Sequence, residues 1–169
     1  MKNHIIVLDG PKGVGKTSIS SVLKNKASNA IFLSLDWIRR SIPNAKATPE
    51  YNQIAFEELL KQTKKSISDW KNIIIDCGLT EQKLEQLEKM VDNLEAKLFK
   101  YSLIAPLEIL LERIKNRDLE EWKIFDEKRC KEVYNKLQSK SFTGYTVFDT
   151  SKMTPEQIVD QMMNQIKSY

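Results

Sequence analysis

Residues 4–23 read HIIVLDGPKGVGKTSISSVL, and this stretch decides how the rest of the chain is interpreted. Within it, Gly10, Gly15, Lys16 and Thr17 fit the phosphate-loop pattern G-x-x-x-x-G-K-[ST] without a mismatch. The apolar run at 5–8 before the pattern is typical of a strand buried on both faces of a parallel sheet. Apolar residues at helical spacing follow it. A strand before the motif and a helix after it are the context that argues against a chance match.

The residue types of this loop suit the binding of phosphates. Its glycines let consecutive backbone amides point at phosphate oxygens, and the following helix adds the positive end of its dipole. Lys16 would bring a charge to the terminal phosphates, and the Thr17 hydroxyl would bind Mg²⁺. The dinucleotide fingerprint G-x-G-x-x-G does not fit, because Gly13-Val14-Gly15 is followed by Lys16-Thr17-Ser18 with no third glycine in place. We therefore expect a nucleoside triphosphate, bound by Gly10, Pro11, Lys12, Gly13, Val14, Gly15, Lys16, Thr17 and Ser18.

Length and composition describe an ordinary globular protein. A chain of 169 residues suits a single domain, expected over residues 1–169, and its formal net charge of +4 gives only weak support to polyanion binding. Cys77 and Cys130 are too few and too far apart for a metal site or a disulfide framework. His4, the single histidine, starts the first strand, so a histidine base is not expected. With no recognisable signal peptide and no membrane-spanning run, we expect a cytoplasmic protein without a membrane partner.

Strand and helix signals alternate along the chain. Apolar runs predict strands at residues 5–8, 30–35, 72–76, 97–104 and 145–148. The first helix is expected to end near residue 27, a helical turn to span 37–42, and helices to start after Thr48, Thr80 and Thr154 and at Pro106. The helix after Thr48 is expected to have one face made of Tyr51, Ile54, Ala55, Leu59, Leu60 and Ile67. The helix after Thr80 is expected to carry Leu84, Leu87, Val91, Leu94 and Leu98 at helical spacing.

This alternation predicts an α/β fold, a three-layer arrangement with a parallel sheet of about five strands and helices on both of its faces. Ligands of such sheets gather at the carboxyl ends of the strands. We therefore expect one functional rim, made of residues 9–17, 36–40, 76–79, 105 and 149–151.

The second strand ends at Asp36, with Arg39 one helical turn later. A carboxylate there could accept the proton of a substrate hydroxyl or hold a magnesium-bound water, and the Arg39 fork could bind an anionic group of the substrate. The alternative is a structural role, because Asp is a favourable helix N-cap.

The third strand ends at Asp76, where a carboxylate near Mg²⁺ is found in phosphate-loop enzymes. Gly78 could bring a backbone amide toward the terminal phosphate. Alternatively, Asp76 simply caps the helix that begins near Thr80.

Arg113 and Arg117 stand at i, i+4 spacing on one predicted helix. One could stack on the nucleotide base, and the other, with Arg117 the stronger candidate, could bind the transferring phosphate. The alternative is an exposed face paired with Glu112 or Asp118.

Residues 116–141 are dense in charge and are interpreted as a mobile helical lid. Arg129 is a weaker candidate for a ligand contact from this lid. A partly buried side of the lid is expected from Trp122, Ile124, Phe125, Val133, Tyr134 and Leu137.

Over its whole length the chain resembles small P-loop kinases of the adenylate-kinase-like fold. LSLDWIRR at 33–40 is similar to the D-x-x-R of polynucleotide kinases and to the G-D-x-x-R of adenylate kinases, with Leu35 in place of that glycine. Continued to Pro43, it is also similar to chloramphenicol phosphotransferase. Residues 113–117 resemble the R-x-x-x-R of nucleotide kinases, and FDTSKMTPEQI at 148–158 resembles their last strand, adenine-side loop and final helix.

The resemblance implies a sheet ordered 2-3-1-4-5, ATP with Mg²⁺, and transfer of the γ-phosphate to a hydroxyl or phosphate of a small molecule or nucleotide. It assigns the role of base to Asp36 and places Thr150 and Ser151 beside the adenine. A polynucleotide 5′-hydroxyl kinase is the nearest alternative, against which the modest charge argues. A non-catalytic or regulatory ATP-binding protein is another, although such a protein has no need of Asp36 and the paired arginines. Residues 41–71 carry no recognised acceptor signature, so the acceptor stays open.

Overall fold

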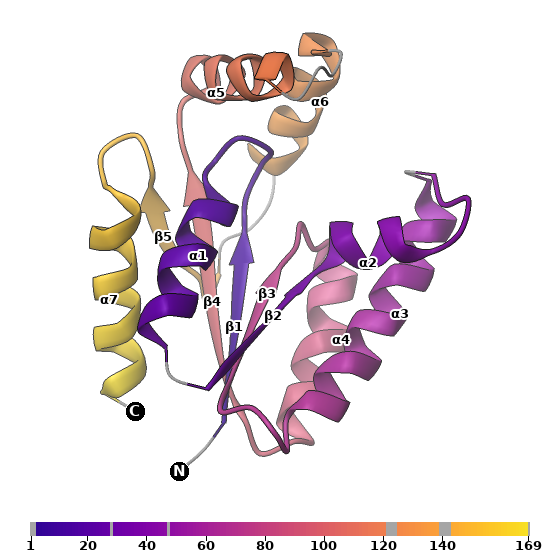
Figure 1. Cartoon of the computed structure of the whole chain (residues 1–169), viewed down its shortest axis with the longest axis vertical. Coiled ribbons are helices and arrows are strands. Elements are labelled where there is room, and N and C mark those ends of the chain that lie inside the picture. Colours follow the sequence, from indigo (N-terminus) through magenta and orange to yellow (C-terminus); the bar gives the residue numbers. More distant parts are fainter. Residues whose placement is uncertain (1–2, 28, 47, 121–124, 139–142, 169) are drawn as a thin grey trace.

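The computed structural model describes residues 3–27, 29–46, 48–120, 125–138 and 143–168. Within them a five-stranded sheet has the order β2-β3-β1-β4-β5, and each neighbouring pair is parallel (Figure 1). The predicted α/β fold and strand order are therefore confirmed. The strands are β1 (His4–Asp9), β2 (Ala30–Ser34), β3 (Asn72–Asp76), β4 (Lys97–Ile104) and β5 (Thr146–Asp149).

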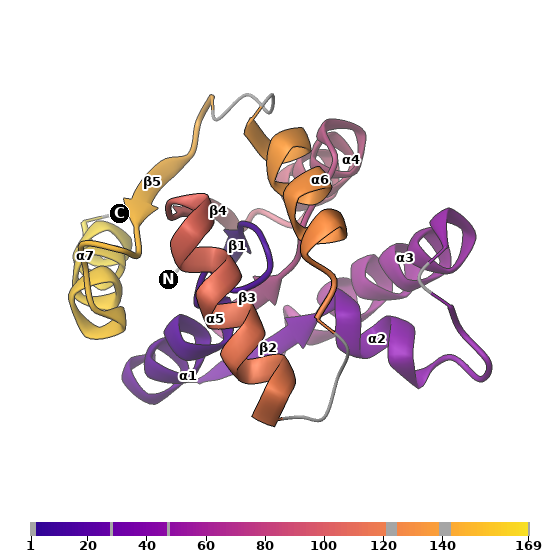
Figure 2. The ribbon, with the colours of Figure 1, turned by 90° about the horizontal axis from the view of Figure 1, so that it is seen from above.

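Helices cover both faces of the sheet. Viewed from above, α1 and α7 lie on one side and α3 and α4 on the other, while α5 crosses over the carboxyl ends of the strands (Figures 1 and 2). Among the helices of the described residues, none is both long and apolar enough to cross a membrane. The helices are α1 (Lys16–Lys26), α2 (Leu35–Ser41), α3 (Pro49–Ser66), α4 (Glu81–Asp92), α5 (Leu107–Glu120), α6 (Glu127–Gln138) and α7 (Pro155–Lys167).

The central strand β1 joins two hydrophobic cores. Successive side chains of a strand point to opposite faces, so Ile6 and Leu8 pack with α1 and α7 while Ile5 and Val7 pack with α3 and α4. All four side chains are fully buried, which explains why this strand is apolar without alternation. His4 lies at its start, with Nδ1 3.0 Å from Asn72 Oδ1 and the ring edge-on to Phe99. A rigid centre of the sheet therefore holds the loop that follows β1.

The predicted helix starts are confirmed at Thr48, Thr80 and Thr154. Each threonine is an N-cap whose hydroxyl accepts a hydrogen bond from a first-turn amide. Thr154 and Gln157 form a full capping box, because the Gln157 side chain accepts a hydrogen bond from the Thr154 amide in return.

The predicted buried face of α3 is confirmed at Ala55 and Leu59 and wrong at Ile54. Phe56 and Thr63 are fully buried with Ala55 and Leu59, whereas Ile54 is 44% exposed. The bulky Phe56 ring occupies the core, and burial of Thr63 is tolerated because its hydroxyl donates to the Leu59 carbonyl. Tyr51, Leu60 and Ile67 are only partly buried.

Three boundaries also differ from expectation. Leu35 begins α2 instead of closing β2, and the last strand is Thr146–Asp149, one residue later than predicted. Helix α4 ends at Asp92, so Leu98, placed at a helical step by its spacing, lies on β4. Such ends are set by caps and turns that apolar spacing does not report.

The predicted lid falls on two helices. Its start at residue 116 lies inside α5, which continues to Glu120, and α6 follows at Glu127–Gln138. Residues 121–124 and 139–142, with Trp122 and Ile124, lie outside the described residues. Tyr134 is partly buried against the core, whereas Val133 is 43% exposed. Movement of this segment stays a prediction.

Candidate functional site

The carboxyl ends of the strands open into a cleft of about 1070 Å³. Its walls are the loop after β1, helix α2, the segment after β3, helix α5 and the loop before α7. Most of the predicted site residues line it together. Those that do are Lys12, Gly13, Val14, Gly15, Lys16, Thr17, Ser18, Asp36, Arg39, Asp76, Gly78, Arg113, Arg117 and Thr150.

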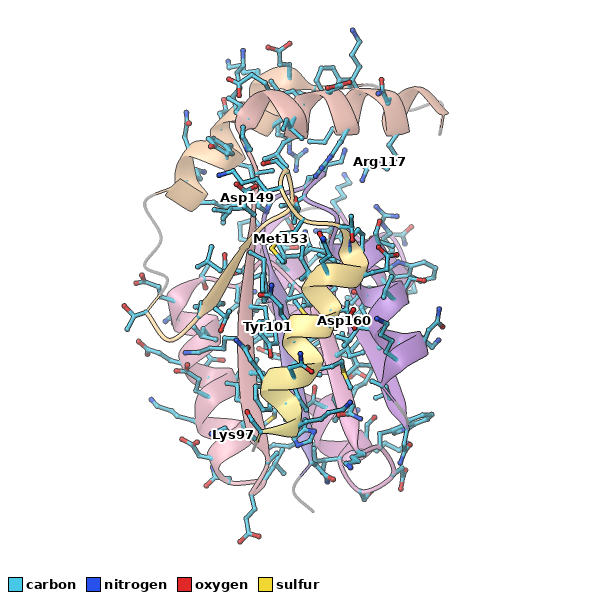
Figure 3. The ribbon with its side chains drawn as sticks, turned by 90° about the vertical axis from the view of Figure 1, so that its left-hand side faces the viewer. Lys97, Tyr101, Arg117, Asp149, Met153 and Asp160 are labelled. Carbon is cyan, nitrogen blue, oxygen red and sulfur yellow. The ribbon has the colours of Figure 1, made fainter. Side chains whose placement is uncertain are left out.

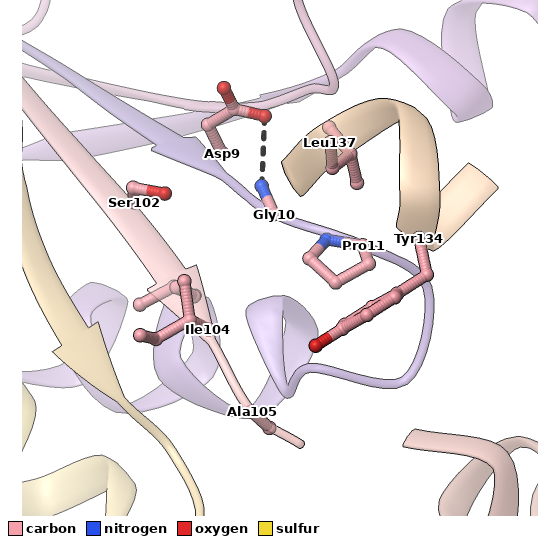
Figure 4. Close-up of a pocket in the computed structure, with 9 residues that line it drawn as sticks. Asp9, Gly10, Pro11, Ser102, Ile104, Ala105, Tyr134 and Leu137 are labelled. Carbon is pink, nitrogen blue, oxygen red and sulfur yellow. Dashed lines mark hydrogen bonds between the residues drawn. The ribbon is translucent and has the colours of Figure 1, made fainter. Parts of the chain in front are cut away.

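Gly10 and Pro11 instead line a second, smaller hollow. It lies between the ends of β1 and β4 and is covered by Tyr134 and Leu137 of α6 (Figure 4). There the Gly10 amide donates a 2.8 Å hydrogen bond to Asp9 Oδ1. This bond holds the start of the loop onto the strand end.

The phosphate loop closes around the Lys16 ammonium. Its Nζ donates to the carbonyl oxygens of Gly10 at 2.9 Å and Pro11 at 3.2 Å, and lies 4.0 Å from Asp76 Oδ1. Gly15 is the N-cap of α1 and has the left-handed φ of 95°, a conformation that favours glycine. The loop, the helix N-terminus and the lysine therefore face one space, an arrangement that can bind a chain of phosphates.

Gly13 presses the loop against α5. At its φ of 82°, a Cβ atom would lie 2.7 Å from Ile114 Cγ1 and 3.0 Å from the Leu110 carbonyl oxygen. The loop is therefore packed directly against the helix that carries Arg113 and Arg117.

Asp76 lies at the end of β3, between the loop and α2. Burial raises the pKa of its carboxyl above the ordinary value of 3.8; the Lys16 ammonium lowers it, and the carboxylates of Asp36 and Asp9 raise it further. The alternative that Asp76 caps α4 is wrong, because Thr80 is that cap.

This chemistry fits a magnesium ion held together with phosphates. Among the described residues no three His, Cys, Asp or Glu side chains form a metal cluster. Mg²⁺ is usually bound by one or two carboxylates together with substrate phosphates, and a dedicated cage is not needed. Thr17, with a hydroxyl, and Asp76, with a partly desolvated carboxylate, both line the cleft and match that requirement.

Asp36 stands in the first turn of α2. The N-cap of that helix is Ser34, whose Oγ accepts from the Trp37 amide, so the alternative of Asp36 as the cap is wrong. The Asp36 side chain is 59% exposed, and its Oδ1 accepts a 2.7 Å hydrogen bond from Arg39 Nη2. Arg40 Nη2 lies 3.8 Å from Asp36 Oδ2, the other carboxylate oxygen.

Two residues that the sequence reading missed extend this group. The other guanidinium nitrogen of Arg39, Nη1, donates to Asn52 Oδ1 at 2.9 Å. Lys83 Nζ donates to the Asn52 carbonyl oxygen at 2.9 Å and lies 5.1 Å from the centroid of the Phe56 ring. Burial lowers the pKa of Lys83, with Cys77 and Glu57 acting in the opposite direction. Asn52 thus joins α2 to α4, and no motif around either residue indicates it.

Arg113 anchors α5 to the loop after β5. Its guanidinium donates to Thr150 Oγ1 at 3.0 Å and to the Thr150 carbonyl oxygen at 2.9 Å, so the alternative of pairing with Glu112 is not what the structure has. Arg117, labelled in Figure 3, lies one turn further along and also lines the cleft. The side chain of Asp118, the alternative partner, lies outside those that the structure describes.

Besides Gly10 and Pro11, the predicted residues Ser151 and Arg129 do not line the cleft. Ser151 donates through its amide and its hydroxyl to Asp149 Oδ1, and these hydrogen bonds lower the pKa of the Asp149 carboxyl. Arg129 is exposed, and its amide donates to Asp126 Oδ1 in the first turn of α6.

The charges of the cleft are unequal. Lysines and arginines outnumber acidic residues along its described lining, where the acids are Asp36 and Asp76. An enclosed wall of one sign raises the local concentration of oppositely charged ligands. The cleft therefore suits polyanions, and its cations are Lys12, Lys16, Arg39, Arg40, Lys83, Arg113 and Arg117.

Comparison with known proteins agrees with this architecture. Residues 6–135 match the family AAA_18, described as an AAA domain. No curated protein matches the chain in sequence. The tunicamycin resistance protein of Deinococcus radiodurans aligns with a TM-score of 0.73 at 16% identity, over 98% of this chain and 96% of that one.

Two further solved structures share the fold. The APS kinase CysC of Mycobacterium tuberculosis, in complex with AMPPNP and APS, has a TM-score of 0.68 at 11% identity, and 98% of each chain is covered. A chain of the Pnkp1/Rnl/Hen1 RNA repair complex has a TM-score of 0.69 at 17% identity, over 81% of this chain and 44% of that one. The predicted likeness to small P-loop kinases is confirmed at the level of the fold.

Proposed function

We propose that this chain, which belongs to the AAA_18 family, transfers the γ-phosphate of ATP to a hydroxyl or phosphate of a small molecule or nucleotide. The observation that carries the proposal is the shared cleft. The phosphate loop opens into one part of it, and the Asp36–Arg39 pair stands in another. Phosphoryl transfer needs this juxtaposition, because the acceptor must be held in line with the terminal phosphate.

Lys16 and Arg117 act on the charge of the transferred group. The Lys16 ammonium is already hydrogen-bonded to carbonyl oxygens of its own loop, so it can exchange them for phosphate oxygens with little loss. Arg117 reaches the cleft from α5 and adds a second cation. Arg113 and Thr150, joined by two hydrogen bonds, form the side that receives the nucleotide base.

Asp36 acts as the base toward the acceptor. Its exposed carboxylate can accept a hydroxyl proton, and the hydrogen bond from Arg39 fixes its orientation. Gly78 lines the same cleft and offers a backbone amide without a side chain in the way. Thr17 and Asp76 would hold Mg²⁺, which neutralises charge on the phosphates when bound.

A polynucleotide 5′-hydroxyl kinase is the second candidate. Trp37 supports it, because this large side chain is 75% exposed and lines the cleft, where it could stack on a base. The modest net charge of +4 argues against a long strand-binding surface. A purely regulatory ATP-binding protein is disfavoured by the Asp36–Arg39 pair, which such a protein does not need.

The test is ATP consumption with Mg²⁺ across a panel of nucleosides, nucleotides, sugars, phenicols and oligonucleotides. We expect one acceptor class to stimulate turnover. The Lys16→Ala variant is expected to lose about 10²-fold or more of it, as when a preorganised charge-stabilising group is removed. Lys24→Ala, which removes an exposed lysine of the same helix, is the matched control and is expected to match wild type. Turnover by Lys16→Ala at the wild-type rate, or no saturable binding of Mg·ATP, would refute the proposal.

A further inference from the structure

Trp37 is a large apolar side chain that stands exposed on the wall of the cleft. The residue is 75% exposed and lines the cleft. The other large hydrophobic residues that are exposed in the described chain are 42–44% exposed, and none lies along the described lining of the cleft; they are Ile54, Val133 and Val147. Single exposed hydrophobic residues are normal on a convex surface, whereas ligand sites are concave and lined by aromatic side chains with a few polar groups. The position of Trp37 in the cleft therefore points to a ligand.

The helix that carries Trp37 is held in one orientation. The Trp37 amide donates to Ser34 Oγ at the N-cap, 3.5 Å away. The next residue, Ile38, is buried in the core beneath α3 and α4. Successive residues of a helix are turned by about 100°, so burial of Ile38 keeps Trp37 out of that core. The backbone thus presents the indole to the cleft, and a side chain with only two χ angles loses little freedom when a ligand binds.

Trp37 lies at the opposite end of the cleft from the side that receives the nucleotide base in the proposed function. Strand β2 leads into α2, strand β5 leads into the loop with Thr150, and these are the two edge strands of the sheet. Four strand spacings of about 4.8 Å separate them, which amounts to about 19 Å. Figure 2 shows α2 and α7 on opposite sides of the molecule, with the central strand β1 between them. A nucleotide with its base beside Thr150 and its phosphates on the loop after β1 therefore does not bring that base to Trp37.

The surroundings of Trp37 favour a small planar group over a protein partner. Its neighbours on α2 that line the cleft are mostly charged, namely Asp36, Arg39 and Arg40. Surfaces that bind proteins present contiguous apolar patches, which these charges interrupt. A planar ring, by contrast, needs only one aromatic face on which to stack.

We propose that the indole of Trp37 stacks on a planar ring of the acceptor, so that the acceptor is a small molecule that joins an aromatic or heteroaromatic ring to the group that is phosphorylated. Asp36 directly precedes Trp37 and lines the same cleft, so a ring on the indole holds the rest of the molecule beside the proposed base. The identity of this ligand as the acceptor rests on the proposed function, whereas the binding of a ring by Trp37 does not. A nucleoside and an aromatic alcohol share this chemistry, and the experiment distinguishes them.

The direct test is a calorimetric titration after saturation with Mg·AMPPNP, which fills the nucleotide side of the cleft. The probes are the ribonucleosides and chloramphenicol, and the controls without an aromatic ring are ribose and glycerol. We expect a ring-bearing probe to bind and both controls to fail. Repeating the titration without Mg·AMPPNP tests Trp37 even where that nucleotide does not bind, an outcome that would refute the proposed function instead.

Substitutions of Trp37 separate stacking from apolar area. Trp37→Ala should weaken binding of the probe by roughly 5- to 100-fold, the range for loss of one stack between a base and an aromatic side chain. Trp37→Phe should keep most of the affinity, whereas Trp37→Leu, which has no aromatic face, should lose it. Ile54→Ala removes an exposed hydrophobic side chain outside the cleft and is expected to match wild type.

Fluorescence reports on the same contact. The chain contains three tryptophans, Trp37, Trp70 and Trp122. A ring stacked on the Trp37 indole should quench its emission in step with the occupancy that calorimetry measures. Trp37→Phe should lose this quenching while it keeps the affinity, a combination that a change of fold would not produce. Thermal unfolding of each variant should match wild type, because a residue that is 75% exposed contributes little packing.

Three binding results would overturn the proposal. The first is equal affinity of Trp37→Ala and wild type for every ring-bearing probe that binds. The second is equal affinity of Trp37→Leu and Trp37→Phe, which would leave apolar area as the sole contribution. The third is that no ring-bearing probe binds to the wild type.

Turnover identifies the source of the ring. We expect a nucleoside or chloramphenicol to stimulate ATP consumption, with KM raised in Trp37→Ala and unchanged in Ile54→Ala. Stimulation by ribose or glycerol alone, or by oligonucleotides alone, would overturn this inference while leaving a phosphotransferase in place. Binding of a ring that depends on Trp37, without turnover of any probe, would support the ring site and count against the proposed function.

Discussion

Glycine can be needed in the phosphate loop for its backbone conformation or for lack of space. Gly→Ala substitutions at Gly13 and Gly15 of the loop, with Gly78 after β3 as a control, would separate these two reasons. Gly13 combines a left-handed φ of 82° with a crowded Cβ position, 2.7 Å from Ile114 Cγ1. Gly15 has a left-handed φ of 95° but open space around its Cβ position. Gly78 has open space and no left-handed φ. The series therefore contains strain with a clash, strain alone, and neither.

The magnitudes follow from these geometries. A left-handed conformation costs an L-residue about 1–2 kcal/mol. Forcing a methyl group into a packed contact costs about 1–3 kcal/mol more. We expect Gly13→Ala to lower the free energy of unfolding by about 2–5 kcal/mol and Gly15→Ala by about 1–2 kcal/mol. Gly78→Ala should raise it by about 0.4–1 kcal/mol, because alanine restricts the unfolded chain.

Urea unfolding followed by circular dichroism measures the series. For a protein of this size, 1 kcal/mol corresponds to about 2–4 °C in Tm, so thermal unfolding resolves the same order. A double-mutant cycle with Ile114→Ala isolates the clash, which should couple to Gly13→Ala and not to Gly15→Ala. Equal stability of Gly13→Ala and Gly15→Ala would show that the loop is not pressed against α5. Equal stability of Gly15→Ala and Gly78→Ala would remove the argument from backbone conformation.

Two carboxylates give further predictions. Asp36→Asn should lower kcat by about 10²–10⁴-fold, the range for loss of a general base, while leaving the affinity for Mg·ATP unchanged; steady-state kinetics with the stimulating acceptor measures it, and an unchanged kcat would reject the role of base. The pKa of Asp76 is raised on folding, so the folded state binds this proton more tightly than the unfolded chain, and the contribution of Asp76 to stability falls as pH rises from 3.8 through the folded pKa. Asp76→Asn should therefore be more stable than wild type at pH 7 and equal to it below the ordinary pKa of 3.8. Urea unfolding at pH 7 and below pH 3.8 measures the difference in stability between Asp76→Asn and wild type. The same difference at both pH values would contradict a raised pKa of Asp76.

Local patterns predicted the nucleotide half of the fold well, because the signals there lie within a few consecutive residues. Strand β3 occupies Asn72–Asp76, as its apolar run predicts. Strand β4 occupies the predicted range Lys97–Ile104, although Lys100 and Ser102 interrupt its apolar residues. A strand buried on both faces has to be continuously apolar, so its bounds are visible in the sequence. The order of the strands in the sheet cannot be predicted in this way, because no pattern within a strand indicates which strands pair with it. That order came from the resemblance to P-loop kinases.

The sequence left the choice open, or predicted it wrongly, where two nearby residues compete for one role. Ser34 and Asp36 are both favourable N-caps, and only the backbone geometry at the end of β2 decides that Ser34 takes the position. Ile54 and Phe56 both suit a buried helix face, and the size of the ring decides for Phe56. In each case the sequence contains both candidates, and packing makes the choice.

The acceptor half of the cleft escaped prediction for a structural reason. Lys83 and Asn52 are 31 residues apart, and their hydrogen bond exists because α3 and α4 pack on the same face of the sheet. Neither residue belongs to a motif, and a lysine in a charged helix is normally solvated. The phosphate loop, by contrast, is made by one stretch of chain. Substitutions in α2, α3 or α4 can therefore change the acceptor without disturbing the loop, so a fold shared with other proteins leaves the acceptor undetermined. Specificity has to be derived from side chains such as Lys83, which lines the cleft but belongs to no motif.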